Sequence, residues 1–154
     1  MISIDHVHPA LVHFPIVLLL LGVILDFAVL VRRGDLAARD CLAATASGAL
    51  VLGAIAAAVA AYFGDVALDI AMTKGFPGDA LERHEELGVA TLSIFAVLAV
   101  LRLALRWQRI PLAGLRGWVV FALGAAGAGV LLTAAYYGGD LVYGLGVNVV
   151  PVTP

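Results

Sequence analysis

Four apolar stretches constrain this chain more than any other feature, because each is long enough to cross the hydrocarbon core of a bilayer. They run approximately over residues 11–31, 41–63, 87–105 and 118–137. About 20 apolar residues in a helix span roughly 30 Å, and a backbone in lipid must satisfy its own hydrogen bonds. The sequence therefore predicts an all-α integral membrane protein, with a single transmembrane domain over residues 1–154 folded as an up-down four-helix bundle.

The composition agrees with a membrane domain. Hydrophobic residues make up 63% of the 154 residues and charged residues only 13%, which excludes an ordinary soluble domain. The first apolar stretch lacks the basic segment and the small-residue cleavage site of a signal peptide, so we expect the mature protein to keep it. The lone Cys41 excludes an intrachain disulfide and a cysteine zinc cluster.

Arginine sets the expected orientation of the bundle. The two short loops at one end contain Arg32, Arg33, Arg39, Arg106, Arg109 and Arg116. Because short arginine-rich loops stay in the cytoplasm, we expect a multi-pass protein of the bacterial cytoplasmic (inner) membrane with both termini on the periplasmic side. The arginines do not form the mixed basic and aromatic surface that binds nucleic acid, so we expect no nucleic-acid partner.

Two histidines are expected at equal depth on the outer side, because each follows a helix start that the sequence marks. Pro9 suits the first turn of a helix that His8 caps, which makes His13 the fifth helical residue. Asp79 begins an aspartate version of the capping box, which makes His84 the fifth residue of its own helix. Equal depth predicts a cofactor or metal that both histidines share.

The first and third stretches run in the same direction, so they should lie on a diagonal across the bundle. One face of the third stretch, at helical spacing, carries His84, Gly88, Thr91, Phe95, Leu98 and Arg102. Gly88 follows His84 by one turn and leaves room where a flat ring held by the histidine would pass. We therefore expect His13 and His84 to face each other across the core.

Two facing imidazoles in an apolar bundle favour one b-type haem per chain, with His13 and His84 as ligands of the haem iron. The sequence has no C-x-x-C-H run, which excludes covalent attachment of a c-type haem. The expected function is cytochrome b-like electron transfer near the outer face, with a periplasmic redox protein or a quinone as partner, rather than stand-alone catalysis. Tyr136 is a candidate hydrogen-bond donor to a haem propionate or quinone, although interfacial anchoring is its plainer role.

Two other classes of function remain open at this point. His8 and Glu85, together with His13 and His84, offer nitrogen and oxygen ligands for copper, zinc or non-haem iron in a metal-binding or sensing module. In a structural subunit of a membrane redox complex, the histidines would only pack. Membrane lipid is the partner that the composition requires, and a homo-oligomer is left open.

Three further elements are expected from local patterns. Asp26 and Arg102, both inside apolar stretches, should form a structural ion pair. The segment Val66–Thr73 should form a short amphipathic helix that covers the outer end of the bundle. The weak alternation of Asp140–Val152 favours an extended C-terminal tail.

Two segments of the chain resemble a known family. They are His8-Pro9-Ala10-Leu11-Val12-His13-Phe14-Pro15-Ile16 and the glycine-rich ending Gly138–Val147. Together with the acidic, histidine-bearing start of the third stretch, they resemble a bacterial family of four-span predicted membrane proteins, domain of unknown function 2231, over nearly the whole chain. The resemblance implies a membrane domain often found beside Rieske or c-type cytochrome domains, which favours electron transfer without assigning a reaction. This chain carries no such module, so we expect its redox partner to be a separate protein.

Overall fold

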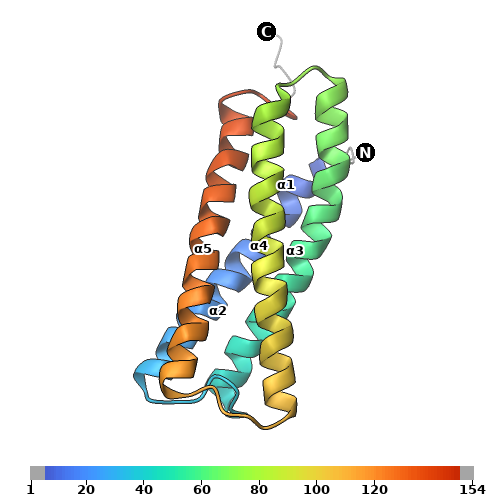
Figure 1. Cartoon of the computed structure of the whole chain (residues 1–154). Coiled ribbons are helices and arrows are strands. Elements are labelled where there is room, and N and C mark those ends of the chain that lie inside the picture. The colour runs from blue at the N-terminus through green and yellow to red at the C-terminus, as the bar shows by residue number, and fades with distance from the viewer. Residues whose placement is uncertain (1–5, 150–154) are drawn as a thin grey trace.

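The structure, a computed structural model, describes residues 6–149 as a bundle of long helices that lie side by side (Figure 1). The helices are α1 (Val7–Leu11), α2 (His13–Val31), α3 (Cys41–Thr73), α4 (Gly78–Trp107) and α5 (Gly114–Tyr143). No strand occurs within the described residues. The predicted all-α, up-down bundle is confirmed.

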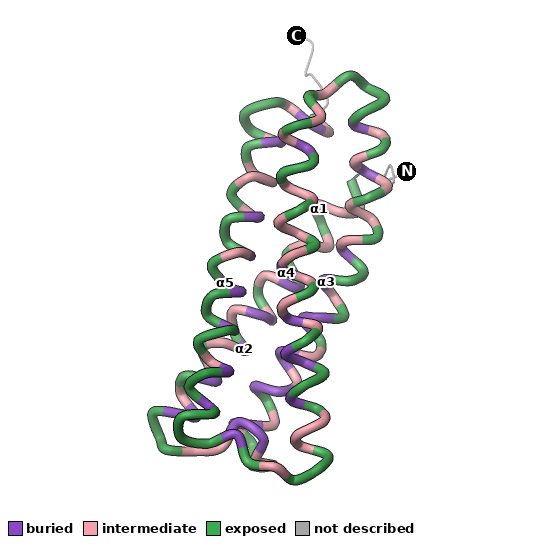
Figure 2. Tube along the Cα trace, in the orientation of Figure 1, coloured by how far each residue is buried: buried purple, intermediate pink, exposed green. Residues whose placement is uncertain are grey.

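Each of the four long helical segments is apolar enough and long enough to cross a membrane. Val7–Val31 has a mean hydropathy of 2.8 over its most apolar window, and the least apolar segment, Gly114–Tyr143, still reaches 1.9. Buried residues lie on the inward faces, while the outward faces are exposed along their length (Figure 2). Many of these exposed side chains are large and apolar, for example Val97 and Val100 on α4. Such faces suit contact with lipid.

Packing between the helices closes a ring in which α2 and α4 lie on one diagonal. α2 packs against α3 and α5, and α4 packs against the same two helices. The diagonal expected for the first and third stretches is therefore confirmed. The short α1 packs against α3 and only lightly against α2.

The first span is broken near its start, contrary to the predicted single helix that begins at Pro9. Helix α1 begins at Val7, and Val12 separates its end at Leu11 from the start of α2. Pro15 has no N–H to donate to the carbonyl of Leu11, so the regular hydrogen-bond ladder fails at this point. The backbone at Val12 keeps helical dihedral angles (φ −60°, ψ −22°), so α1 leads directly into α2, and α1 packs against α3.

Two other sequence-based boundaries are wrong. Val66–Thr73 is not a separate covering helix, because α3 continues without interruption to Thr73. Helix α4 begins at Gly78, after the N-cap residue Pro77, so Asp79 lies in the first turn rather than capping it. His13 and His84 are consequently not the fifth residues of their helices.

The predicted extended tail is also wrong where the structure describes it. Helix α5 continues through the Gly138-Gly139 pair to Tyr143, and turns follow up to residue 149. The amide of Val147 donates to the carbonyl of Leu141 (2.8 Å), and Gly146 adopts a positive φ of 72° that permits this turn. The last part of the predicted tail, residues 150–152, lies outside the described residues.

A buried ion pair joins the diagonal helices in the core. Arg102 on α4 donates from Nη1 to Oδ1 of Asp26 on α2 (2.7 Å) and from Nη2 to Oδ2 (2.5 Å). The exposed fraction is 1% for Arg102 and 7% for Asp26. This two-point contact, which satisfies both carboxylate oxygens, confirms the predicted pair.

The two loops at the arginine-rich end are tied to each other. The amide of Leu36 donates to the carbonyl of Leu112 (3.1 Å), and the amide of Leu112 donates to Oδ1 of Asp35 (2.7 Å). Leu36 and Leu112 are both buried. This end of the bundle is therefore closed by paired loops rather than by a single connection.

Candidate functional site

The structure brings together a histidine pair, His8 of α1 and His84 of α4. The ring centroids lie 6.0 Å apart, and the ring planes are nearly perpendicular, at 80°. His84 was expected in the site, but its partner was expected to be His13. The leaning of α1 onto α3 puts His8 in that place instead.

Each ring of the pair donates a hydrogen bond to a backbone carbonyl of a neighbouring helix. Nδ1 of His8 lies 2.8 Å from the carbonyl oxygen of Ala60 on α3, and Nδ1 of His84 lies 3.0 Å from that of Ala134 on α5. Because a carbonyl oxygen only accepts, Nδ1 must carry the proton in both rings. In a neutral imidazole this leaves the lone pair on Nε2, the nitrogen then available to a metal.

A glycine one turn after each of these carbonyls makes room for the ring. A Cβ atom added to Gly64 would lie 3.0 Å from Nδ1 and Cε1 of His8, and one added to Gly138 would lie 2.7 Å from Cε1 of His84. The contact at Gly138 is too close for a real Cβ, and the one at Gly64 is tighter than nearly all real Cβ contacts. The two rings are thus held by the same local arrangement, once on α3 and once on α5.

The two halves of the chain share this arrangement. Residues 60–64 read Ala-Ala-Tyr-Phe-Gly and residues 134–138 read Ala-Ala-Tyr-Tyr-Gly. His8 and His84 are 76 residues apart, and so are Asp26 and Arg102. The first hairpin consists of α1, α2 and α3, and the second consists of α4 and α5. If the two hairpins are superimposed, His8 falls on His84 and Asp26 falls on Arg102. This is the pattern that two similar hairpins give around an approximate two-fold axis along the bundle.

The histidine pair lies between two apolar clusters. The main core, which includes Leu19, Leu50 and Phe95, fills the part of the bundle toward the arginine-rich loops. A smaller cluster closes the other end and consists of Ala71, Leu81, Leu141 and Val147. The imidazoles are therefore enclosed along the bundle axis by apolar side chains on both sides.

Gly88 borders open space in this layer. On the same face of α4, Thr91, Phe95 and Arg102 are buried, in agreement with the predicted inward stripe. A Cβ atom added to Gly88 would meet no heavy atom within 4 Å. The space beside Gly88, one turn after His84, is thus open, at the place where the sequence predicted room for a flat ring.

The other predicted site residues lie elsewhere. His13 is exposed on α2, with Nδ1 at 3.4 Å from the carbonyl oxygen of Ala10, and it makes no described contact with His84. Tyr136 is exposed, and its described ring contact is with Tyr137. Glu85 is half-buried on α4. The roles predicted for these three residues gain no geometric support.

The alternative non-haem ligand set is not assembled in the part of the chain that the structure describes. Over residues 6–149, no three His, Cys, Asp or Glu side chains lie close enough together to hold a metal ion. A structural zinc site needs four protein ligands and a catalytic one needs three. The described donor set is limited to two imidazoles, His8 and His84.

Sequence reasoning named His8 only as an alternative metal ligand and chose His13 as the partner of His84, and it missed the role of both glycines beside the rings. The repeated Ala-Ala-Tyr-aromatic-Gly string was the available signal. A glycine at the same place in two similar helices, each opposite a helix that carries a histidine, indicates a paired site. The packing of α1 against α3, which brings in His8 rather than His13, had no comparably clear signal.

Comparison with known proteins identifies a family without an assigned activity. A model of predicted membrane proteins, DUF2231, matches residues 5–151. No curated protein and no solved structure matches the chain. The site must therefore be interpreted from its own geometry.

Proposed function

We propose that this chain, which belongs to the DUF2231 family of predicted membrane proteins, binds one b-type haem between His8 and His84 and serves in electron transfer. One observation carries the proposal. The two imidazoles lie 6.0 Å apart, and each is bonded through Nδ1 to a carbonyl, so that Nε2 is the free ligating nitrogen. Two neutral imidazoles, each with a free Nε2, are suitable protein ligands for a low-spin haem iron.

The number of ligands favours haem over a bare metal ion. A haem, if bound, would take its two protein ligands from His8 and His84, and it would need no further ligand from the chain. Copper, zinc or non-haem iron would require further ligands that the described residues do not gather here.

The surroundings of the pair suit a haem of this kind. The open space at Gly88 adjoins His84, and apolar clusters lie beyond the pair in both directions. When bound, the haem supplies a one-electron couple. The apolar clusters limit the access of water to the half-buried imidazoles along the bundle axis. The carbonyls of Ala60 and Ala134 keep each Nδ1 proton in place and make the imidazoles more basic.

A cation and a hydroxyl lie at the edge of this layer. Arg83 precedes His84, and Tyr137 precedes Gly138. Nη1 of Arg83 lies 3.5 Å from the hydroxyl of Tyr137, and the guanidinium lies 5.5 Å above the tyrosine ring. These two groups, rather than Tyr136, are suited to bind the propionate carboxylates of a haem.

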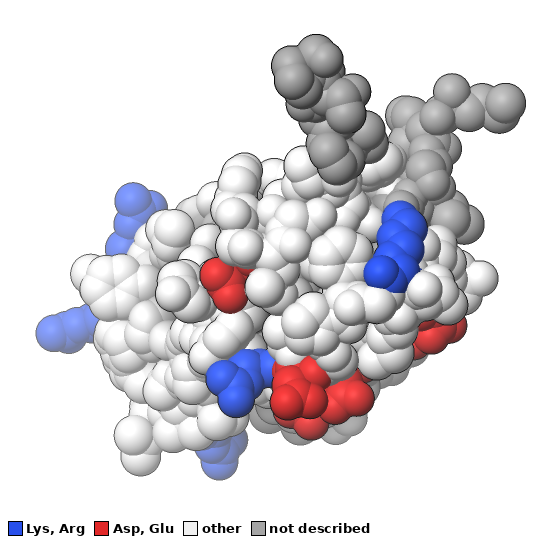
Figure 3. Space-filling view, turned by 90° about the horizontal axis from the view of Figure 1, so that it is seen from above, with Lys and Arg blue, Asp and Glu red and all other residues white. Residues whose placement is uncertain are grey.

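The proposed electron partner docks at the end of the molecule that carries the pair. Viewed from this end, the surface is mostly uncharged, and several of its acidic side chains gather at one edge, next to a basic side chain (Figure 3). The exposed acidic residues in this half of the bundle are Asp65, Asp69, Asp79, Glu82, Glu86 and Asp140. A surface of this charge steers a basic partner toward it. With the arginine-rich loops in the cytoplasm of a bacterium, this end faces the periplasm, and the partner is a periplasmic redox protein or a membrane quinone.

Absorption spectra of the purified protein and three histidine variants test the proposal. The protein is produced with added haem precursor, purified in detergent, and measured after air oxidation and after reduction with dithionite. We expect a sharp reduced α band and a shifted Soret band for the unmodified protein and for His13→Ala. His8→Ala and His84→Ala should each lose the low-spin spectrum.

A folding control accompanies these variants. His8→Met and His84→Met keep a ligand at the iron, so they should retain haem with an altered spectrum, which a protein that has failed to fold would not do. A visible spectrum without haem bands in the unmodified protein would contradict the proposed function. Retention by His8→Ala together with loss in His13→Ala would contradict the assigned ligands.

A further inference from the structure

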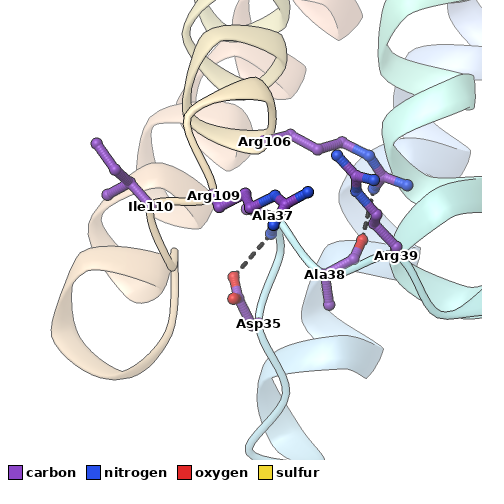
Figure 4. Close-up of a pocket in the computed structure, with 7 residues that line it drawn as sticks. All are labelled: Asp35, Ala37, Ala38, Arg39, Arg106, Arg109 and Ile110. Carbon is purple, nitrogen blue, oxygen red and sulfur yellow. Dashed lines mark hydrogen bonds between the residues drawn. The ribbon is translucent and has the colours of Figure 1, made fainter.

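A second candidate site lies at the opposite end of the bundle, where the start of α3 meets the end of α4. A groove of about 360 Å³ is lined by Arg39, Leu103, Arg106 and Trp107. An adjoining groove of about 290 Å³ is also lined by Arg39 and Arg106, and by Arg109 from the loop after α4. The three arginines lie together around the second groove (Figure 4).

The charge of these arginines is not balanced by nearby acid. The one carboxylate that lines either groove belongs to Asp35. Its Oδ1 already accepts from the amides of Ala37 (2.8 Å) and Leu112 (2.7 Å). Asp35 holds the two loops together, and three arginines against this one carboxylate leave the second groove with a net positive charge.

The guanidinium groups are also available to a ligand. Arg106 donates to the carbonyl of Ala38 (2.5 Å), which fixes its position over the groove. The guanidinium groups of Arg39 and Arg109 have no hydrogen bond or ion pair within residues 6–149. Like charges gathered at one place repel each other, and a bound anion relieves this repulsion.

Apolar surface continues from the arginines along the outside of α4. Trp107 is 86% exposed, and Leu103, one turn earlier, is 47% exposed. Val100, a further turn away, is exposed on the same side. The order along this surface is thus cation, then an exposed tryptophan of the kind found at membrane interfaces, then an aliphatic strip of the kind that contacts lipid tails.

We propose that these grooves bind the headgroup of an anionic phospholipid, with a phosphate against Arg39 and Arg106 and an acyl chain along Trp107 and Leu103. Basic pockets between transmembrane helices bind acidic headgroups in this way. The apolar strip is the reason to assign a lipid rather than free phosphate, since free phosphate would use the arginines alone. This inference does not depend on the haem.

Thermal unfolding in detergent with three additives tests the site. The additives are micelles that contain phosphatidylglycerol, micelles that contain phosphatidylcholine, and inorganic phosphate without added lipid. A ligand that binds only the folded protein raises its melting temperature, and we expect a rise of about 3 °C with phosphatidylglycerol and none with the other two. Arg39→Gln should lose most of this rise, and it should fold because its guanidinium has no partner to lose.

Arg116→Gln is the matched control, because Arg116 is exposed at the same end but lines neither groove. It should respond to phosphatidylglycerol as the unmodified protein does. Three outcomes would overturn the proposal: an equal rise with phosphatidylcholine, an equal rise with inorganic phosphate, or equal responses of Arg39→Gln and Arg116→Gln. The unmodified protein should also carry phosphatidylglycerol in native mass spectra, and phosphatidylcholine carried equally well would overturn it too.

Discussion

At the scale of single residues, the histidine pair depends on two glycines in helix interiors. Glycine in a helix costs about 1 kcal/mol relative to alanine, so Gly64 and Gly138 carry an intrinsic cost. The structure gives a reason for both, because each occupies the position where a Cβ would collide with an imidazole. The helix gives up some stability at these positions so that a ring can reach the carbonyl one turn earlier.

Gly138→Ala and Gly64→Ala should therefore displace the histidine rings without destabilising the helices. The added Cβ of Gly138→Ala would lie 2.7 Å from Cε1 of His84, so the ring has to move away from the carbonyl of Ala134. We expect a severalfold loss of bound haem, measured as Soret absorbance per protein. The helical circular dichroism should be unchanged, because alanine favours the helix.

The same helices provide matched controls. A Cβ added to Gly48 on α3 or to Gly129 on α5 would meet nothing within 4 Å. Gly48→Ala and Gly129→Ala should retain full haem content. Equal haem content in all four variants would show that the glycines do not position the ligands.

At the residue scale, the sequence indicated half of the histidine pair correctly. The stripe on the third span marked His84 as inward, and Gly88 does border open space. The choice between His8 and His13 depends on which face of the first span packs against α3: His8 bonds the carbonyl of Ala60 there, and His13 is exposed. Counting residues from a helix start cannot supply that choice, because it results from packing against α3.

At the scale of elements, the Asp26–Arg102 pair connects two diagonal helices that otherwise touch little. Both side chains are buried, so each charge depends on the other for compensation. A buried pair is weak evidence for net stability, but removal of one partner leaves an uncompensated charge in an apolar core. The pair should therefore enforce the rotation of α2 and α4 about their axes.

Single and double replacements test the coupling of these helices. Asp26→Leu or Arg102→Met alone should lower the free energy of unfolding by about 3–5 kcal/mol, and the double variant should recover most of that loss. Unfolding by denaturant in detergent, followed by circular dichroism, measures the three values. A double variant whose loss equals the sum of the two single losses would rule out the coupling.

Element boundaries were the weakest part of the sequence-based fold. The four spans and their order follow from hydropathy alone, and the structure confirms them. The short helix predicted over Val66–Thr73 is part of α3, which runs through Gly64 without interruption. In the same way, α5 runs through Gly138 and Gly139 to Tyr143, where an extended tail was predicted from Asp140. Gly64 and Gly138 each lie against an imidazole, and the sequence does not distinguish such a glycine from one in a turn.

At the scale of the whole molecule, two similar hairpins form one bundle with both polar pairs near its axis. The histidine pair lies toward one end, and the ion pair lies deeper in the main core. The arginine-rich loops close the opposite end. A molecule built in this way has chemically different ends, and its function depends on which end faces which compartment.

Native Cys41 reports this orientation without a substitution, because it is exposed at the start of α3, at the arginine-rich end. With that end in the cytoplasm, as the arginines favour, a membrane-permeant maleimide should label Cys41 in spheroplasts, and an impermeant one should not. In a Cys41→Ser background, Asp69→Cys near the other end of α3 should react with both reagents. The reverse pattern would place the histidine pair on the cytoplasmic side.

The central claim is that His8 and His84, rather than His13 and His84, hold one haem. The most direct test compares the reduced-minus-oxidised spectra of His8→Ala and His13→Ala, prepared side by side with equal haem supply. The account predicts that His13→Ala keeps the α band of the unmodified protein and that His8→Ala loses it. An α band that persists in His8→Ala would contradict the account.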